Sequence, residues 1–541
     1  MKNIFVFTIV IFLFLGCNYK SENVDLIIHN GQVYSDAGFN PRDQAMAIKD
    51  GKIIAIGAEQ EILNKYSTEQ IIDASKNYIY PSFYDAHCHF VGYAEGLNEL
   101  DLVGTVSYAE ILKKVIAYQE KNQSKFVIGR GWDQNDWEVK EFPTKKELDS
   151  LFPTVPIFLE RIDGHAALVN EAMLQQCNFK NYRNSIERYL IKKGNQFTGV
   201  VLDNAMDSIS KYLPEIDSLT MEKLLVKAEK NCFEKGITNI CEAGISVTQA
   251  NFLTELSIKN KLKIEMYIML SANAETKLFF KKGPVKKDKI NIRSIKLYGD
   301  GALGSRGAAL KKPYSDDVKN YGTILQPVSF YEEYAEFCTK NGIQLNTHCI
   351  GDSANGLFLN IYKKYLPPSN DLRWRIEHAQ VVDKKDISIF KECNIVPSVQ
   401  PTHATSDMEW AAQRLGKDRI GDAYAYKNLK DQLGIIALGT DFPVEDIDPL
   451  KTFYAATCRK NIEGNPLNGF QTENALSRKD ALNGMTIWAA ISCFEEKERG
   501  SLEIGKEANI IIIDTDLLNC KETSILKAKI KNTFIKGEKV F

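Results

Sequence analysis

Residue types that commonly bind metal ions recur along this chain at the ends of short apolar stretches. The set is a His-x-His pair, two single histidines and an aspartate, namely His87, His89, His348, His378 and Asp441. Each follows a stretch that is typical of a buried strand. Functional residues at the ends of successive strands are typical of a (β/α)8, TIM-like barrel, whose active site lies at the carboxyl ends of its strands. The order of these residues therefore predicts an α/β fold of this class with a metal site.

The composition is that of an ordinary globular protein. A chain of 541 residues is too long for a single barrel, so we expect at least one further domain or large insertion. The formal net charge of −2 gives no electrostatic reason to expect nucleic acid or an anionic membrane as a partner. Only seven histidines are present, and four of them belong to the set above. That concentration argues against four unrelated core histidines.

Residues 1–16 are predicted to be a signal peptide of the lipoprotein type. The start is basic, and the apolar run that follows is too short to cross a bilayer as a helix. The residues before Cys17 resemble a bacterial lipobox, which implies cleavage before Cys17 and lipidation of its thiol. Residues 17–23 would be a tether, and the protein would be exported and lipid-anchored to the bacterial cell envelope, facing the periplasm. The alternative is a plain signal peptide with a chance cysteine.

Strand-rich segments at both ends of the chain suggest a domain outside the barrel. Residues 24–80 contain short apolar runs and a hairpin signal at Asp50-Gly51. Residues 496–541 also contain short apolar runs and a hairpin-like turn. We expect one small β-sandwich built from both termini, with the barrel, residues 81–495, inserted in it. Residues from about 100 to 220 do not follow the βα alternation. They are predicted to form an insertion after the first barrel strand that arches over the active-site face.

The predicted ligands could bind two ions. In a His-x-His on a strand both imidazoles lie on one side, because side chains alternate between the two faces. His87 and His89 can then bind one divalent ion, with Zn²⁺ the usual choice for nitrogen and oxygen ligands that have no redox task. His348 and His378, from different strands, could bind a second ion. Asp441 could both bind metal and move protons.

The ten cysteines that follow Cys17 form no Cys-x-x-Cys pair and no regular framework. An exported protein could oxidise some of them. Most, such as Cys241 and Cys349, lie in apolar surroundings and are expected to be buried free thiols. Cys88 lies between two predicted ligands, and strand alternation is expected to direct it away from the metal.

Lys296, at or near the end of the fourth barrel strand, is a candidate bridge between two ions. A lysine ammonium beside two dications is electrostatically unfavourable. A deprotonated lysine could instead react with CO2 and become a carbamate, whose two oxygens can bridge the ions. The alternative from residue chemistry alone is a lysine that reaches solvent or pairs with Asp300.

Short motifs along the chain carry a family resemblance. They are residues 84–89, 131–133, 161–165, 296–301, 346–348, 376–379, 400–403 and 438–443. Together they resemble the amidohydrolase superfamily and, within it, the YtcJ-like branch (the amidohydrolase-3 type), which includes N-substituted formamide deformylases. The resemblance covers about residue 24 to the C-terminus. It implies a β-sandwich plus barrel and a binuclear site bridged by carboxylated Lys296, but it does not identify the substrate, because the branch is chemically diverse.

The resemblance also implies metal-assisted hydrolysis of a small molecule. Two ions would lower the pKa of a bridging water to near neutrality, and the hydroxide would attack a carbonyl carbon. Asp441 would accept the proton and deliver it to the leaving nitrogen. His165 and His403 are candidates for steadying the oxyanion or a substrate carbonyl, with structural roles as the alternative. Trp132 and Asp133 could line the pocket, although the tryptophan could instead pack the insertion.

We therefore expect cleavage of a non-peptide C–N bond in an amide, an N-formyl or N-acyl group, or a cyclic amide. One alternative is a mononuclear, deaminase-like site with an unmodified Lys296. Another is hydrolysis of an ester, lactone or phosphoester, because the same hydroxide can attack those centres. An exported binding lipoprotein without catalysis is a different class, and the complete ligand set argues against it. The oligomeric state is open, with a homodimer as one candidate.

Overall fold

The computed structural model describes residues 21–35, 38–39, 43–179, 183–367 and 369–541. The predicted signal peptide and the predicted lipidation site, Cys17, lie outside the described residues. Within the described part of the chain, no helix combines the length and the apolar character needed to cross a membrane.

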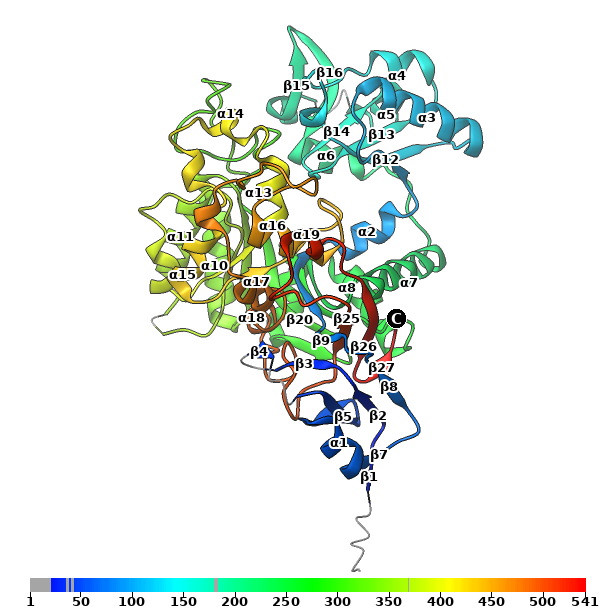
Figure 1. Ribbon diagram of the computed structural model, residues 1–541. Coiled ribbons are helices and arrows are strands. Elements are labelled where there is room, and N and C mark those ends of the chain that lie inside the picture. Colours follow the sequence, from blue (N-terminus) through cyan, green and yellow to red (C-terminus); the bar gives the residue numbers. More distant parts are fainter. Residues whose placement is uncertain (1–20, 36–37, 40–42, 180–182, 368) are drawn as a thin grey trace, which may run out of the picture.

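Eight parallel strands form the centre of the molecule, as the strand-end pattern predicts (Figure 1). They pair in chain order, and the connections between them return the chain to the same end of the sheet each time. β19 (Val285–Lys287) adds an antiparallel strand beside β20. The nearly closed barrel is therefore confirmed. Its strands are β10 (Phe83–Cys88), β17 (Ile237–Ile245), β18 (Glu265–Ser271), β20 (Ile290–Tyr298), β21 (Gln344–Cys349), β22 (Arg375–His378), β23 (Val396–Val399) and β24 (Ala437–Leu438).

Hydrogen bonds join the last strand of the barrel to the first. The Asp441 amide donates to the His87 carbonyl oxygen (2.8 Å). The buried carboxylate of Asp85 accepts from the Thr440 amide (3.0 Å) and from the Thr440 hydroxyl (2.6 Å). Gly439 lies in this contact, where a Cβ atom would come within 2.5 Å of the His87 nitrogen. Because glycine has no side chain, the two strand ends can approach closely enough to bring His87 and Asp441 together.

Helices cover the outside of the barrel (Figure 1). α8 (Val247–Ile258) begins with a capping box in which Ser246 and Gln249 exchange side-chain and backbone hydrogen bonds. α10 (Val328–Asn341) ends at Gly342, whose φ of 64° is a left-handed conformation that glycine adopts readily. The buried faces of these helices join the main hydrophobic core around the strands. Other helices of this layer are α7 (Ser218–Glu234), α11 (Asp352–Tyr365), α15 (Tyr426–Leu433) and α16 (Pro449–Cys458).

Strands from the two ends of the chain meet in one mixed sheet of six strands. There β9 (Tyr78–Pro81) pairs antiparallel with β25 (Ile510–Ile513) and parallel with β3 (Gln32–Ser35). The N-terminal segment alone forms a second, four-stranded sheet, in which Asp50-Gly51 make the expected tight turn with positive φ. The two sheets share apolar core residues, but one small β-sandwich domain remains a prediction. The remaining strands of the two sheets are β2 (Leu26–His29), β4 (Gly38–Phe39), β5 (Ala45–Lys49), β6 (Lys52–Gly57), β8 (Ile71–Asp73), β26 (Ile530–Ile535) and β27 (Glu538–Lys539).

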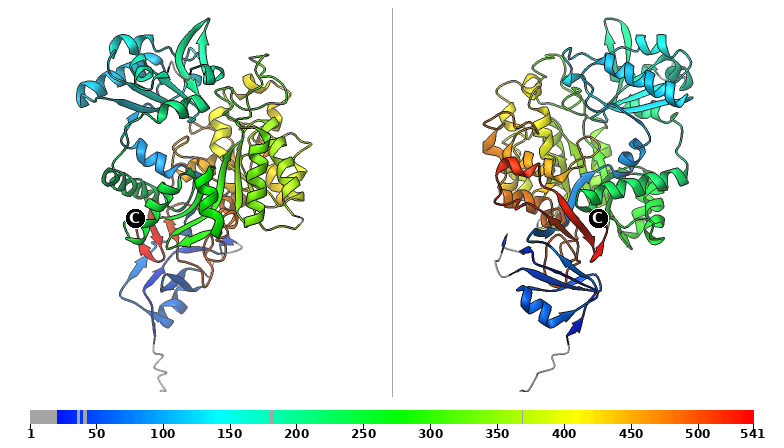
Figure 2. Two further views of the ribbon diagram at one scale, coloured as in Figure 1. Left: turned by 180° about the vertical axis from the view of Figure 1, so that it is seen from behind. Right: turned by 45° about the vertical axis from the view of Figure 1, so that its right-hand side comes forward.

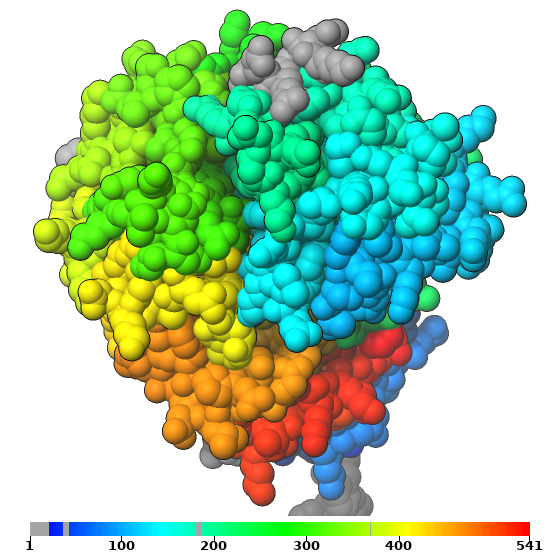
Figure 3. All heavy atoms as spheres, turned by 90° about the horizontal axis from the view of Figure 1, so that it is seen from above, coloured from blue at the N-terminus to red at the C-terminus, as the bar shows by residue number. Residues whose placement is uncertain are grey.

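The chain between the first and second barrel strands forms a separate six-stranded sheet, from β11 (Leu100–Asp101) to β16 (Gln196–Leu202). Its buried residues make two hydrophobic clusters of their own. In all three ribbon views this insertion lies at the end of the molecule opposite the N-terminal strands (Figures 1 and 2). Seen from above, the insertion covers one side of the molecule (Figure 3). Its other elements are α3 (Tyr108–Asn122), β12 (Val127–Trp132), α4 (Lys146–Leu151), β13 (Ile157–Arg161), β14 (Ala166–Val169), α5 (Glu171–Gln176), β15 (Leu190–Lys193) and α6 (Asp203–Ser210).

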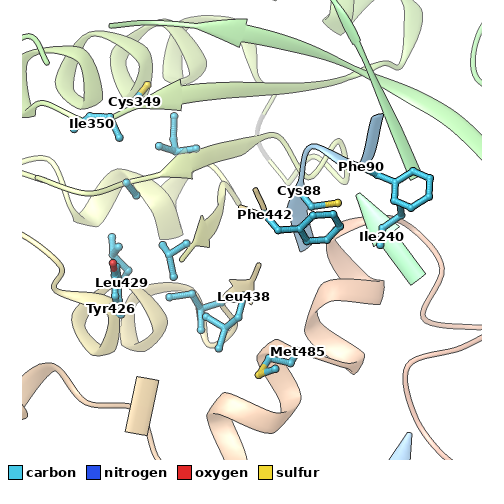
Figure 4. Close-up of a cluster of buried hydrophobic side chains, with 14 of the residues drawn as sticks. Cys88, Phe90, Ile240, Cys349, Ile350, Tyr426, Leu429, Leu438, Phe442 and Met485 are labelled. Carbon is cyan, nitrogen blue, oxygen red and sulfur yellow. The ribbon is translucent and has the colours of Figure 1, made fainter. Parts of the chain in front are cut away.

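Cys88, at the end of β10, packs among apolar side chains rather than against the predicted ligands. It is wholly buried, and Figure 4 shows it beside Phe90 and Phe442. Its thiol donates a hydrogen bond to the Cys241 carbonyl oxygen (3.5 Å). Cys88, Cys241 and Cys349 are buried free thiols, as the sequence predicts.

Candidate functional site

The strand ends bring the predicted ligands together at one end of the barrel. His87 lies in β10 and His348 in β21, while His378 ends β22 and Asp441 follows β24. Side-chain donor atoms of His87, His378 and Asp441 all lie within 4.8 Å of one another, and the three residues are buried. This spacing would let one divalent cation contact all three side chains.

His89 and His348 border this group. His89 Nε2 lies 3.2 Å from Asp441 Oδ1, and His87 Nε2 lies 3.5 Å from the same oxygen. The ring centroid of His348 is 4.5 Å from that of His378. All five predicted residues therefore border one small space, with the Asp441 carboxylate next to the His-x-His pair.

Two of these residues have a backbone conformation that is rare for residues with a side chain. φ is 70° at His378 and 64° at Asp441, which is the left-handed region, and Ala379 follows with a φ of 41°. Such strain costs of order 1–3 kcal/mol per residue and is concentrated at functional sites. At the end of β22, Glu377 and His378 both contact the His87 ring, although strand alternation alone would send adjacent side chains to opposite faces.

Lys296 in β20 reaches the same space. Its side chain is almost fully buried, and Nζ lies 3.3 Å from His87 Nε2. Burial lowers the pKa of Lys296 to about 8, so the neutral amine forms more readily than in an ordinary lysine. The lysine therefore does not reach solvent. Asp300, the other partner considered for it, accepts hydrogen bonds from the backbone amides of Ala309, Ile350 and Gly351.

The donor atoms fit a divalent metal ion. Burial lowers the pKa values of His87, His348 and His378 well below the usual value, so these imidazoles are in the neutral form that binds metal. Among the described residues, His348 Nε2 and Asp441 Oδ1 are buried without a hydrogen-bond partner. A buried polar atom without a partner is costly, and a bound cation would satisfy both of these atoms.

Asp441 is ionised in this setting. Burial opposes its charge, but the neighbouring His89 and His403 lower its pKa well below the usual value for an aspartate. The His403 Nε2 atom lies 3.6 Å from Asp441 Oδ2. An ionised carboxylate in this position can bind a cation or accept a proton.

The structure places His403 beside the predicted ligands. It belongs to α13 (Pro401–Asp407), the helix that follows β23, and its ring stacks on that of His378 with centroids 5.8 Å apart. Gln400 precedes this helix, and its Oε1 lies 2.7 Å from His378 Nδ1. His403 therefore contacts the site from its own helix, while Gln400 supports a ligand and had not been predicted from the sequence.

The insertion brings His165 to the same space. His165 precedes β14, and its ring centroid is 5.2 Å from that of His348. Its Nδ1 atom lies 2.8 Å from Asp203 Oδ1. Burial opposes a charge on this ring, but Asp203 raises the pKa of His165 to about 9, so the ring is a cation at neutral pH. No sequence motif marks Asp203, because the insertion sheet rather than local spacing brings the two residues together.

A cavity of about 770 Å³ lies between the insertion and the barrel. Its wall includes His165 from the insertion and His348, His378 and Asp441 from the barrel. The volume is within the range of pockets that bind small molecules. The insertion and the barrel ligands thus face one shared space.

The two other residues predicted for the pocket have different positions. Asp133 lies in the cavity wall, where it pairs with the buried guanidinium of Arg161. Trp132 is wholly buried in the insertion, and its Nε1 donates to the Leu159 carbonyl oxygen (2.7 Å). The expectation that Trp132 lines the pocket is therefore corrected, because its large ring fills the core of the insertion instead.

Charged residues behind the ligands were missed in the sequence. Glu377 Oε2 lies 2.5 Å from His87 Nδ1, and Arg375 pairs with the same carboxylate. All three side chains are wholly buried. The signal that could have found them is a pair of opposite charges two residues apart in an apolar strand, because a buried strand carries such charges only when they are paired.

Comparisons with known proteins agree with this geometry. A family model described as "Amidohydrolase family" matches residues 70–541. "Putative amidohydrolase YtcJ" of Bacillus subtilis (strain 168) is 29% identical over 528 residues, which cover 95% of this chain and 99% of that protein. "N-substituted formamide deformylase" of Arthrobacter pascens is 22% identical over 543 residues, which cover 95% of this chain and 97% of that protein.

A solved structure shares the architecture. The crystal structure of an uncharacterized metal-dependent hydrolase from Pyrococcus horikoshii OT3 matches with a TM-score of 0.75 at 26% identity, covering 92% of this chain and 99% of that one. The family match includes every barrel strand and every predicted ligand described above. This chain therefore belongs to the amidohydrolase family.

Proposed function

We propose that this protein is a metal-dependent hydrolase that cleaves a non-peptide C–N bond in an amide, an N-formyl or N-acyl group, or a cyclic amide. The observation that carries the proposal is the buried group of His87, His378 and Asp441 in contact with a cavity of about 770 Å³. The similarity to a protein named N-substituted formamide deformylase supports the bond type. The cavity volume supports a small-molecule substrate.

Two divalent ions, with Zn²⁺ as the first choice, are proposed for the site. Ions bound there would supply Lewis acidity and a water of lowered pKa. A carbamate on Lys296 would bridge them, and the burial and lowered pKa of this lysine support it, because CO2 reacts with a neutral amine. The proposed metal-binding residues are His87, His89, Lys296, His348, His378 and Asp441.

Asp441 is the proposed proton carrier. Its ionised carboxylate can accept a proton at Oδ1 or Oδ2 and return it to the leaving nitrogen. His165 approaches from the insertion as a cation, so its ring can donate a hydrogen bond to a substrate oxygen on which negative charge develops. His403 can contact the same region through its Nε2 atom, which has no hydrogen-bond partner among the described residues. Asp133, in the cavity wall, would contact a more distant part of the substrate.

A mononuclear, deaminase-like site is the second candidate. It is favoured by one observation: within the described ranges, His87, His378 and Asp441 form the single close group of three metal-binding side chains. Elemental analysis of protein purified without chelator and supplemented with zinc and bicarbonate distinguishes the mononuclear from the binuclear site. Close to two ions per chain supports the binuclear site, whereas one ion or fewer contradicts it.

The reaction type is tested by screening the purified, metal-replete protein against N-formyl, N-acyl and cyclic amides. Esters and lactones are assayed in parallel, because an activated water can attack those carbonyl carbons too. Turnover of an amide that stops when metal is removed supports the proposal. Turnover of esters or lactones alone would contradict the bond type, and metal-independent turnover would contradict the mechanism.

We also propose export and lipid anchoring through Cys17. The support is the sequence of residues 1–17. A single acyl chain binds a membrane only weakly, but several chains on one cysteine would anchor the protein firmly. Cys17→Ser should be soluble or unprocessed in cell fractionation, while Cys393→Ser, as the control, should fractionate like the wild type. A Cys17→Ser protein that is cleaved normally and stays on the membrane would contradict the proposal.

A further inference from the structure

The two ring nitrogens of His87 face different surroundings. Nε2 lies 3.3 Å from Lys296 Nζ and 3.5 Å from Asp441 Oδ1, among the proposed metal-binding residues. Nδ1 lies 2.5 Å from Glu377 Oε2. The side chains of His87 and Glu377 are both wholly buried. A water molecule therefore does not compete for the contact between Nδ1 and the carboxylate.

Arg375 keeps the Glu377 carboxylate paired. Its Nε lies 2.7 Å from Glu377 Oε1, and its Nη2 donates to Oε2 at 3.0 Å. The same Nη2 atom donates to the Ala86 carbonyl oxygen (2.5 Å) and to the Ser398 hydroxyl (2.7 Å). A carboxylate that pairs with a guanidinium accepts hydrogen bonds through its oxygens. Oε2 therefore requires a hydrogen on His87 Nδ1.

We propose that Glu377 is the positioning residue of His87. By accepting the Nδ1 hydrogen it fixes the tautomer in which Nε2 carries the lone pair, and it holds the ring so that this lone pair faces Lys296 and Asp441. The inference rests on the proposed metal site, where a ligating histidine commonly donates its other N–H to a carboxylate or carbonyl. His378 has a neutral partner instead, the amide oxygen of Gln400. Of the two residues that support these histidines, Glu377 is therefore the one with a carboxylate.

Nitrogen-15 NMR of the metal-free protein, labelled at histidine, tests the tautomer without any turnover. The chain has seven histidines, and the His87 signals are identified by their absence in His87→Gln. We expect His87 to be protonated at Nδ1 and unprotonated at Nε2. A ring protonated at Nε2, or one that averages between the two tautomers, overturns the proposal.

Metal affinity, measured by competition with a chromogenic zinc chelator, tests the consequence. Glu377→Gln keeps the size of the side chain but offers a neutral oxygen, and it should weaken zinc binding about 10–100-fold. Glu377→Asp keeps the carboxylate and should recover part of that loss. Glu229→Gln is the matched control, because this buried glutamate accepts hydrogen bonds from the Lys263 and Ile264 amides and contacts no ligand.

Thermal unfolding of the metal-free variants shows whether each is folded. A folded Glu377→Gln protein with wild-type zinc affinity overturns the proposal, and so does a Glu377→Asp protein that recovers nothing. If Glu377→Gln does not fold, the tautomer in the wild-type protein still decides. A wild-type protein that binds no zinc would overturn the proposed function instead, so the two failures can be told apart.

Discussion

The barrel and the insertion hold histidines in different protonation states around one cavity. In the barrel, His87, His348 and His378 are buried and neutral, because burial lowers their pKa values. In the insertion, Asp203 raises the pKa of His165 to about 9 against the effect of burial. The same residue type is therefore held in two charge states within one site. A neutral imidazole can bind a metal ion, whereas a cationic one can only donate hydrogen bonds.

The two regions also hold their histidines differently. The barrel histidines are in or at the ends of strands, and Gly439 and the left-handed residues His378 and Asp441 bring these ends together. His165 sits in a turn of a separate sheet, held by the Asp203 side chain. We infer that metal binding belongs to the barrel alone and that the insertion acts on the substrate.

Metal removal should abolish activity. Dialysis against a chelator should reduce turnover to the background rate, and added Zn²⁺ should restore it, because the barrel residues would otherwise lack the Lewis acid. Circular dichroism should show that the metal-free protein keeps its helices and strands. Full turnover by a protein shown to be metal-free by elemental analysis would contradict the inference that activity depends on metal bound by the barrel.

Asp441→Asn should lower the rate more than it lowers metal content. The amide keeps an oxygen of similar size but loses the proton acceptor, and positioned acid–base groups contribute roughly 10²–10⁴-fold in rate. Rate and bound metal are measured on the same preparation. Asp431→Asn, on the surface helix α15 and paired with Lys427, is the control and should behave like the wild type. Near-native turnover by Asp441→Asn would mean that another group moves the proton.

His165→Ala should keep its metal and lose roughly 10²-fold in rate, the effect typical of a lost donor to a developing oxyanion. Asp203→Asn should lose part of the same factor, because the ring would keep its place but lose the carboxylate that makes it a cation. His29→Ala is the control, since His29 pairs with Glu59 in the N-terminal region. Loss of a metal ion from His165→Ala would move this residue into the metal site and remove the division between barrel and insertion.

Much of the barrel, and the convergence of the candidate ligands at one end of it, could be predicted from the sequence, because strand ends in such barrels converge by geometry. His87, His348, His378 and Asp441 were found in this way. The last strand, β24, is only Ala437–Leu438 and ends before Thr440. The reason is that the Thr440 amide bonds to the Asp85 side chain instead of extending a ladder with the neighbouring strand.

The residues that support the ligands could not be predicted in the same way. The Arg375 and Glu377 charges mark a buried ion pair in the sequence, but not its contact with His87, which is far away along the chain. Asp203 acts through His165, and no local spacing marks it. For Trp132 the sequence left two positions open, the pocket wall and the core of the insertion. Its place beside Asp133 in a motif favoured the pocket, but the side chain turns into the core of the insertion. Motif position identifies a neighbourhood, while side-chain direction depends on the packing around it.

The smallest expected effect is a pH-dependent difference in stability that belongs to the insertion alone. The folded pKa of His165, about 9, lies above its usual value of 6.5. The pairing with Asp203 therefore stabilises the folded state below about pH 6.5, and this contribution is lost as the pH rises through about 9. Its size is at most about 3 kcal/mol, from 1.36 kcal/mol per pKa unit. In metal-free protein, the thermal midpoint of the wild type should exceed that of His165→Gln at pH 6, and the gap should close by pH 10. A gap that stays constant across this range would mean that His165 is neutral in the folded protein, like the barrel histidines, and that the contrast between the two regions does not hold.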